Sequence, residues 1–143
     1  MAARKTKKKK ANKYNAKKVV LDGIEFDSET EGKRYLTLKK AQEEGIISDL
    51  ELQPQYIILP AIKGERIKHF KRIPDRIEEY TIQQPVKYTA DFRYVKDGQI
   101  VVEDVKGSKF TMSRDLPLRI KMMKYFHNID VKLIFKQQIL YNV

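Results

Sequence analysis

The chain has 143 residues and a formal net charge of +11, with no cysteine and two histidines. This length suits a single domain with one core. The lack of cysteine excludes disulfides, zinc sites with thiolate ligands and a cysteine nucleophile, and it is typical of proteins of a reducing cytoplasm. No apolar stretch approaches the roughly 20 residues of a membrane helix. We therefore expect a cytoplasmic protein that has no membrane partner and no multi-histidine metal site.

The positive charge is concentrated at the start of the chain. Residues 1–20 hold nine lysines and arginines and no acidic residue, so the remainder is nearly balanced. Basic arms of this kind are usually flexible and often bind nucleic acid. We expect residues 1–18 to form a flexible basic arm and residues 19–143 a single domain, with Lys7, Lys8, Lys9 and Lys10 as nucleic-acid contacts. A solubilising or targeting tail is the alternative, because basic runs alone are weak evidence.

The domain is predicted to begin with a short hairpin and a helix. Asp22-Gly23 separates the hairpin arms 18–21 and 24–26. Ser28 with Glu31 forms a capping box at the start of a helix that runs to about Glu44. Gly45 is expected to end it. Glu31 either bonds back to the cap or, on the core-facing stripe of the helix, reaches a metal ion. Both interpretations stay open from the sequence.

The next stretch is predicted to be a strand followed by a long excursion. Residues 46–59 alternate as a strand does, and Pro54 indicates an edge position or a bend. Residues 60–85 are an insertion rich in basic residues, and excursions of this length are often functional. We interpret them as a basic flap or strand extension, in which Lys68, Lys71 and Arg72 contact phosphates. A solvated loop is the alternative, because four acidic residues dilute the charge.

A hairpin is predicted over residues 88–107. Asp97-Gly98 is typical of a two-residue type I′ turn, and the resulting register places Asp91 directly opposite Asp104. Lys106 then shares the face of Asp104, and Glu103 lies on the other face. Like charges opposite one another destabilise a ladder, whereas a divalent cation would relieve the repulsion. A surface hairpin with a charged edge is the alternative, and a bulge would shift the register.

A second helix and a last strand are predicted to complete the domain. Thr111, Ser113 or Asp115 can cap a helix that runs to about Phe126. Arg119 and Lys121 near its start could reach a phosphate. Residues 130–136 are expected to form the last strand, and residues 139–141 to pack beneath it.

This order of elements resembles the PD-(D/E)xK nuclease superfamily and, within it, a family of small phage-borne nuclease-like proteins. The resemblance covers roughly residues 19–136. The matching pieces are Phe26-Asp27-Ser28-x-x-Glu31 with Arg34-Tyr35, Gln53-Pro54, Tyr88-x-Ala90-Asp91-Phe92, and Glu103-Asp104-Val105-Lys106-Gly107. Ala90 stands where the superfamily pattern has proline. Glu103 is an alternative acid to Asp104, but Asp104 has the expected spacing to Lys106 and the expected face.

The resemblance implies an α/β (α+β) fold with a restriction-endonuclease-like αβββαβ core, in which a central mixed sheet is flanked by helices. It implies a site that binds Mg²⁺ or Mn²⁺ through Asp91, Asp104 and Glu31, with the Val105 carbonyl as a further ligand. Lys106 would complete the catalytic set, and Gln53 and Lys121 would be auxiliary residues.

The function expected from this resemblance is a Mg²⁺-dependent DNA endonuclease acting on branched DNA such as recombination intermediates. If phage-encoded, it would work in the cytoplasm of a bacterial host. A junction resolvase cuts two strands, so a homodimer is expected. The alternatives are a non-catalytic nucleic-acid-binding protein on a nuclease-like fold and a small basic structural or ribosome-associated protein. The paired acids weigh against both.

Overall fold

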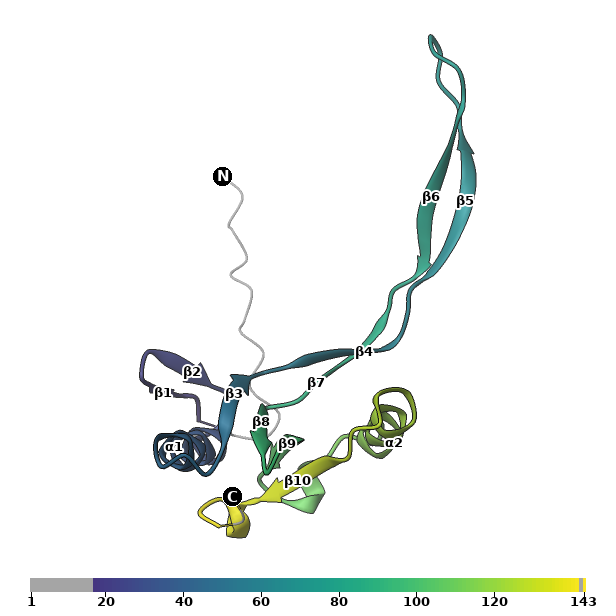
Figure 1. Cartoon of the computed structure of the whole chain (residues 1–143). Helices are drawn as coiled ribbons and strands as arrows, with labels where there is room; N and C mark the ends of the chain where they lie inside the picture. Colours follow the sequence, from purple (N-terminus) through teal and green to yellow (C-terminus); the bar gives the residue numbers. More distant parts are fainter. Residues whose placement is uncertain (1–16, 142) are drawn as a thin grey trace, which may run out of the picture.

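The computed structural model describes residues 17–141 and residue 143. It is a mixed α+β fold built around a four-stranded sheet (Figure 1). Its elements are β1 (Val19–Leu21), β2 (Ile24–Phe26), α1 (Glu29–Glu43), β3 (Ser48–Leu52), β4 (Gln55–Leu59), β5 (Ile62–Lys68), β6 (Arg76–Gln83), β7 (Val86–Thr89), β8 (Phe92–Lys96), β9 (Gln99–Lys106), α2 (Leu116–His127) and β10 (Val131–Phe135), with short 3₁₀ turns at Lys109–Thr111 and Lys136–Gln138.

The four-stranded sheet has the order β10-β9-β8-β3, with a parallel pair β9/β10 and antiparallel pairs elsewhere. Helix α1 packs on one face, where Leu38 meets Phe92 and Tyr94. Helix α2 packs on the other, where Met123 meets Val102. Strand β9 is therefore buried on both sides from residue 102 to residue 105, whereas Ile100, near its start, is exposed. The expectation of a central mixed sheet flanked by helices is confirmed.

The start of the domain follows the sequence closely. The hairpin β1/β2 turns at Asp22 and Gly23, which have φ of 52° and 76°. The Ser28 hydroxyl accepts a hydrogen bond from the Glu31 amide at 3.1 Å, which caps α1. Gly45, with φ of 74°, follows the helix in the left-handed conformation that glycine adopts without strain.

Residues 46–59 form two strands rather than one. The chain bends between β3 and β4 at Gln53-Pro54, where Gln53 has φ of 51°, so the bend expected at Pro54 is confirmed. Residues 60–85 are not a solvated loop: β5 and β6 form an antiparallel hairpin with a tip at residues 69–75.

Strands β3 to β8 together form one long antiparallel ribbon. Glu51 pairs with Arg93, Tyr56 with Tyr88, and Arg66 with Glu78, and each pair is placed symmetrically about Arg72. Small register shifts interrupt the ribbon in each of its three parts. Figure 1 shows that the β5–β6 end projects away from the four-stranded sheet, whereas β3 and β8 at the other end belong to it.

The second hairpin, β8/β9, has the predicted turn and register. Asp97 and Gly98 have φ of 51° and 73°, and Phe92 pairs with Glu103 while Lys96 pairs with Gln99. Helix α2 begins after Asp115 and ends at His127, and Asn128, with φ of 54°, turns the chain towards β10. Ile139 is buried as expected, whereas Leu140 and Tyr141 are exposed.

Candidate active site

The β8/β9 ladder ends at the Phe92–Glu103 pair, so Asp91 lies just before β8 and outside the regular pairing, but its carboxylate still lies beside that of Asp104. The Asp91 amide donates to the Glu103 carbonyl at 3.0 Å, and the Asp91 carboxylate accepts from the Val105 amide at 2.6 Å. On its other side, the Asp91 carbonyl accepts from the Gln53 amide at 2.9 Å. Strand β9 and the bend between β3 and β4 therefore hold the Asp91 backbone from both sides.

Both carboxylate oxygens of Asp104 have partners. Asp104 is 4% exposed. Its Oδ1 lies 2.8 Å from the Lys106 ammonium, and its Oδ2 accepts a hydrogen bond from the Tyr88 hydroxyl at 2.8 Å. Lys106 thus shares the face of Asp104, as predicted.

The two acids oppose each other electrostatically. Burial, followed by the charge of Asp104, raises the pKa of Asp91 to about 8, and the Val105 amide counteracts this only in part. Burial and the Asp104 charge also raise the pKa of Tyr88, which keeps this phenol a hydrogen-bond donor. A group that binds a proton this tightly beside a second carboxylate is typical of a functional site.

Glu31 lies in the field of the same pair. It is 6% exposed, and its pKa is raised first by burial, then by the charge of Asp27, with a smaller contribution from Asp104 and an opposing one from Lys106. Its amide serves the Ser28 cap, and its carboxylate accepts a backbone hydrogen bond from Asp27. The carboxylate thus bonds back to the backbone just before the helix, and the same carboxylate lies in the field of Asp104.

Glu103 has a different set of partners on the opposite face of β9. Its two carboxylate oxygens form a bidentate pair with Arg34 at 2.7 and 2.8 Å, and one of them accepts from the Tyr94 hydroxyl at 2.6 Å. Arg34, fully buried, also donates to the carbonyls of Ile139 and Tyr141 at 2.9 and 2.8 Å. Asp104 is therefore the acid that faces Asp91, and Glu103 joins α1 to the sheet.

The remaining candidate residues lie outside the acid pair. Gln53 contributes its backbone, and its side chain is exposed. Arg119 contacts Asp115 at 2.6 Å and the Lys87 carbonyl at 2.8 Å, and its charge is close enough to lower the pKa of Tyr88 slightly. Lys121 lines a shallow apolar pocket on α2 with Leu118 and Tyr125.

The basic candidates divide into two groups. Lys68, Lys71 and Arg72 lie at and next to the tip of the β5–β6 hairpin. Lys7, Lys8, Lys9 and Lys10 lie outside the described residues.

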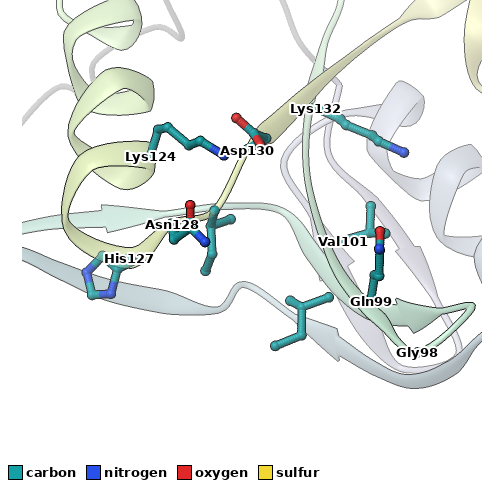
Figure 2. A pocket seen from close by; sticks show the side chains of 10 residues that line it. Gly98, Gln99, Val101, Lys124, His127, Asn128, Asp130 and Lys132 are labelled. Carbon is teal, nitrogen blue, oxygen red and sulfur yellow. Dashed lines mark hydrogen bonds and ion pairs between the residues drawn. The ribbon is translucent and has the colours of Figure 1, made fainter.

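A larger hollow lies at the opposite end of β9 from Asp104 (Figure 2). It is lined by the β8/β9 turn, the end of α2 and the start of β10, including Lys132 and the ion pair of Lys124 with Asp130 at 2.6 Å. None of the predicted site residues lines it.

The acid pair offers oxygen ligands of the kind that Mg²⁺ or Mn²⁺ binds. Among residues 17–141 and 143, no three histidine, cysteine or acidic side chains are already grouped to hold an ion. Two carboxylates can nevertheless suffice for Mg²⁺, because water and substrate phosphate complete its shell. The repulsion that raises the pKa of Asp91 is what a divalent cation would relieve. The residues present therefore fit the ion.

Comparison with known proteins gives a family but no activity. A family model described as protein of unknown function (DUF1064) matches residues 11–141. No curated protein and no solved structure gives a significant match. No helix within the described residues is long and apolar enough to cross a membrane. Because the match spans most of the chain, the protein belongs to the DUF1064 family.

Proposed function

We propose that this protein is a Mg²⁺-dependent DNA endonuclease on a restriction-endonuclease-like core of the PD-(D/E)xK type. The observation that carries the proposal is that the Asp91 and Asp104 carboxylates lie side by side, with the Lys106 ammonium 2.8 Å from the Asp104 carboxylate. The order α1, β3, β8, β9, α2, β10 supports the fold assignment, because it gives αβββαβ once β4 to β7 are regarded as an insertion.

The proposed roles follow from the chemistry of each side chain. Asp91 and Asp104 would hold the ion, and Glu31 would complete its first shell or hold a water bound to it. When bound, Mg²⁺ polarises a phosphate and lowers the pKa of a bound water. Lys106 would orient the attacking water or neutralise charge that develops on the phosphate. Tyr88, which donates to Asp104 Oδ2 at 2.8 Å, holds that carboxylate in place.

The state of Asp91 makes ion binding dependent on pH. With a pKa of about 8, Asp91 carries a proton in much of the free protein at neutral pH. Ion binding requires the carboxylate form, so it releases this proton. We therefore propose that ion affinity rises with pH up to about 8.

The finer substrate class that we propose is branched DNA such as recombination intermediates, cut by a homodimer. A symmetric dimer would present two copies of the acid pair to two strands. If the protein is phage-encoded, the reaction would take place in the host cytoplasm.

A non-catalytic nucleic-acid-binding protein is the second candidate. The observation that favours it is that Lys106 and Tyr88 already engage both oxygens of Asp104. Against it, such a protein would gain nothing from keeping two mutually repelling acids beside DNA phosphates.

The deciding experiment is cleavage of labelled linear duplex, single-stranded, flap and four-way-junction DNA in Mg²⁺, Mn²⁺ or EDTA. We expect metal-dependent cutting that falls by about 100-fold or more in Asp104→Asn and in Lys106→Met. Asp130→Asn is the matched control, because it also removes one carboxylate that is paired with a lysine, but at the far end of the sheet. Tight DNA binding with no cutting in either metal would establish the second candidate instead.

A further inference from the structure

The β5–β6 arm, residues 62–83, has no core of its own. Its strands pair with each other, and most of their side chains are exposed on both faces, including Ile67 at 61% and Ile77 at 72%. Figure 1 shows it projecting from the rest of the molecule. An isolated two-stranded hairpin is marginally stable in water. An arm of this kind is therefore expected to gain its stability by binding something.

Charges along the β5–β6 arm are paired near its base. Lys63 contacts Glu79 at 2.6 Å, and Arg66 contacts Glu78 at 3.0 Å. These pairs leave the part of the arm next to β4 and β7 nearly neutral, so the base presents little net charge to a partner.

The tip of the β5–β6 arm, residues 69–75, and the Lys68–Arg76 pair that flanks it differ from the base. Asp75 folds it by contacting His69 at 2.7 Å and accepting from the Phe70 amide at 3.3 Å. Lys71, Arg72 and Arg76 form no ion pair within the part of the chain that the structure describes. The end of the arm is thus held in one conformation by Asp75, and the cations of Lys71, Arg72 and Arg76 face solvent.

We infer that this tip binds the phosphate backbone of duplex DNA, at a place separate from the bond that the acid pair would cut. The inference rests on the proposed function for its ligand. Asp91 lies 15 positions after Arg76 in the chain. At about 3.4 Å per residue the ribbon between them spans at most about 50 Å. One turn of B-DNA is about 34 Å, so the arm is long enough to reach backbone a full turn away.

The shape of the tip favours a duplex over other phosphate-bearing partners. A two-stranded ribbon fits the roughly 12 Å width of the major groove. Proteins that bind single strands rely instead on rows of aromatic side chains for stacking. Phe70 is the only phenylalanine, tyrosine or tryptophan between residues 68 and 76.

The test is the affinity of the full chain for a labelled 40-base-pair duplex, measured by fluorescence anisotropy in EDTA between 50 and 200 mM salt. The tip variant combines Lys71→Gln and Arg72→Gln. The matched control combines Lys33→Gln and Lys40→Gln on α1, which removes the same charge from exposed helical positions away from the arm. Both pairs are exposed, so both variants are expected to fold.

We expect the tip variant to bind the duplex at least about tenfold more weakly. The slope of log binding constant against log salt concentration should be shallower by about 2, because each phosphate contact contributes about 0.9 to this slope. The control should stay within about twofold of wild type. An unchanged affinity and slope in the tip variant would overturn the inference. So would a tip variant that loses binding only to phosphatidylglycerol vesicles, which would point to a membrane surface.

Because binding is measured in EDTA, its outcome is independent of cleavage. If the wild-type protein does not cut DNA and the tip variant binds the duplex more weakly, the nuclease proposal is rejected and this inference is kept. A protein that cuts DNA but binds equally well without the tip charges would do the reverse.

Discussion

Asp91 carries a carboxyl group whose ionisation the fold opposes. Its pKa is raised to about 8 by burial and by Asp104, so the folded chain binds this proton more tightly than the unfolded chain does. The contribution of Asp91 to stability is therefore greatest below about pH 4 and is lost as the pH rises towards 8. Sites of this kind trade stability for function.

The substitution Asp91→Asn should remove the loss of stability that occurs in the wild type as the pH rises towards 8. Without metal, we expect the variant to be more stable than wild type by about 2 to 4 kcal/mol at pH 8 and about equally stable at pH 4. Thermal unfolding of both proteins at the two pH values checks this, with Asp130→Asn as the control. A stability difference that does not change with pH would contradict the raised pKa.

Glu103 and Asp104 are neighbours in sequence, but Glu103 pairs with Arg34 in the core and Asp104 belongs to the proposed metal site. Isosteric substitutions should therefore affect stability and cleavage differently. Glu103→Gln removes the negative charge that faces the buried Arg34 guanidinium, so we expect a loss of about 3 to 5 kcal/mol in the free energy of unfolding. Asp104→Asn relieves the repulsion of Asp91 but also loses the ion pair with Lys106. It should therefore change stability little while lowering cleavage by about 100-fold or more. Urea unfolding and the cleavage assay, run on both variants, give the comparison. Equal destabilisation by the two changes would show that both acids serve the core.

The boundaries of the helices and strands could be predicted mostly from local signals, such as turn and capping residues. The turn at Asp97-Gly98 fixed the β8/β9 register without any distant contact, and Ser28 and Gly45 bounded α1. The Arg34–Glu103 pair could not be predicted in this way, because its partners are 69 residues apart. From the sequence, an acidic residue such as Glu103 on a buried strand indicates only that it needs a partner, not which residue provides it. The split of residues 46–59 into two strands likewise depends on their pairing with β7 and β8.

The β5–β6 arm should be the least protected sheet element. Its amides bond only across one ladder and both of its faces are open to water, so we expect them to exchange hydrogen orders of magnitude faster than those of β8 and β9. Hydrogen exchange followed by mass spectrometry measures both elements in one sample. Slow exchange in the arm of the free monomer would mean that something already covers it.

For the whole molecule, a bound ion should appear as added stability. A ligand that binds only the folded state at ten times its Kd contributes about 1.4 kcal/mol, which for a chain of this size raises Tm by about 3 to 6 °C. We expect this shift with Mg²⁺ or Mn²⁺ at pH 8, a smaller one at pH 6, where Asp91 holds its proton, and none in Asp104→Asn. Calorimetric scans with and without metal test it. An equal shift in the variant would place the ion elsewhere.

The ribbon symmetrical about Arg72 also bears on how the sheet assembles. Pairing Gln55 with Thr89 directly would close a loop of 33 intervening residues, at an entropic cost of about 3 kcal/mol or more. If the ribbon instead zips from its tip, each new pair lies next to one already made, and only a short closure is needed at any step. The arm then gives the chain a route of local steps to the distant pairing of β3 with β8, the strand that Asp91 precedes.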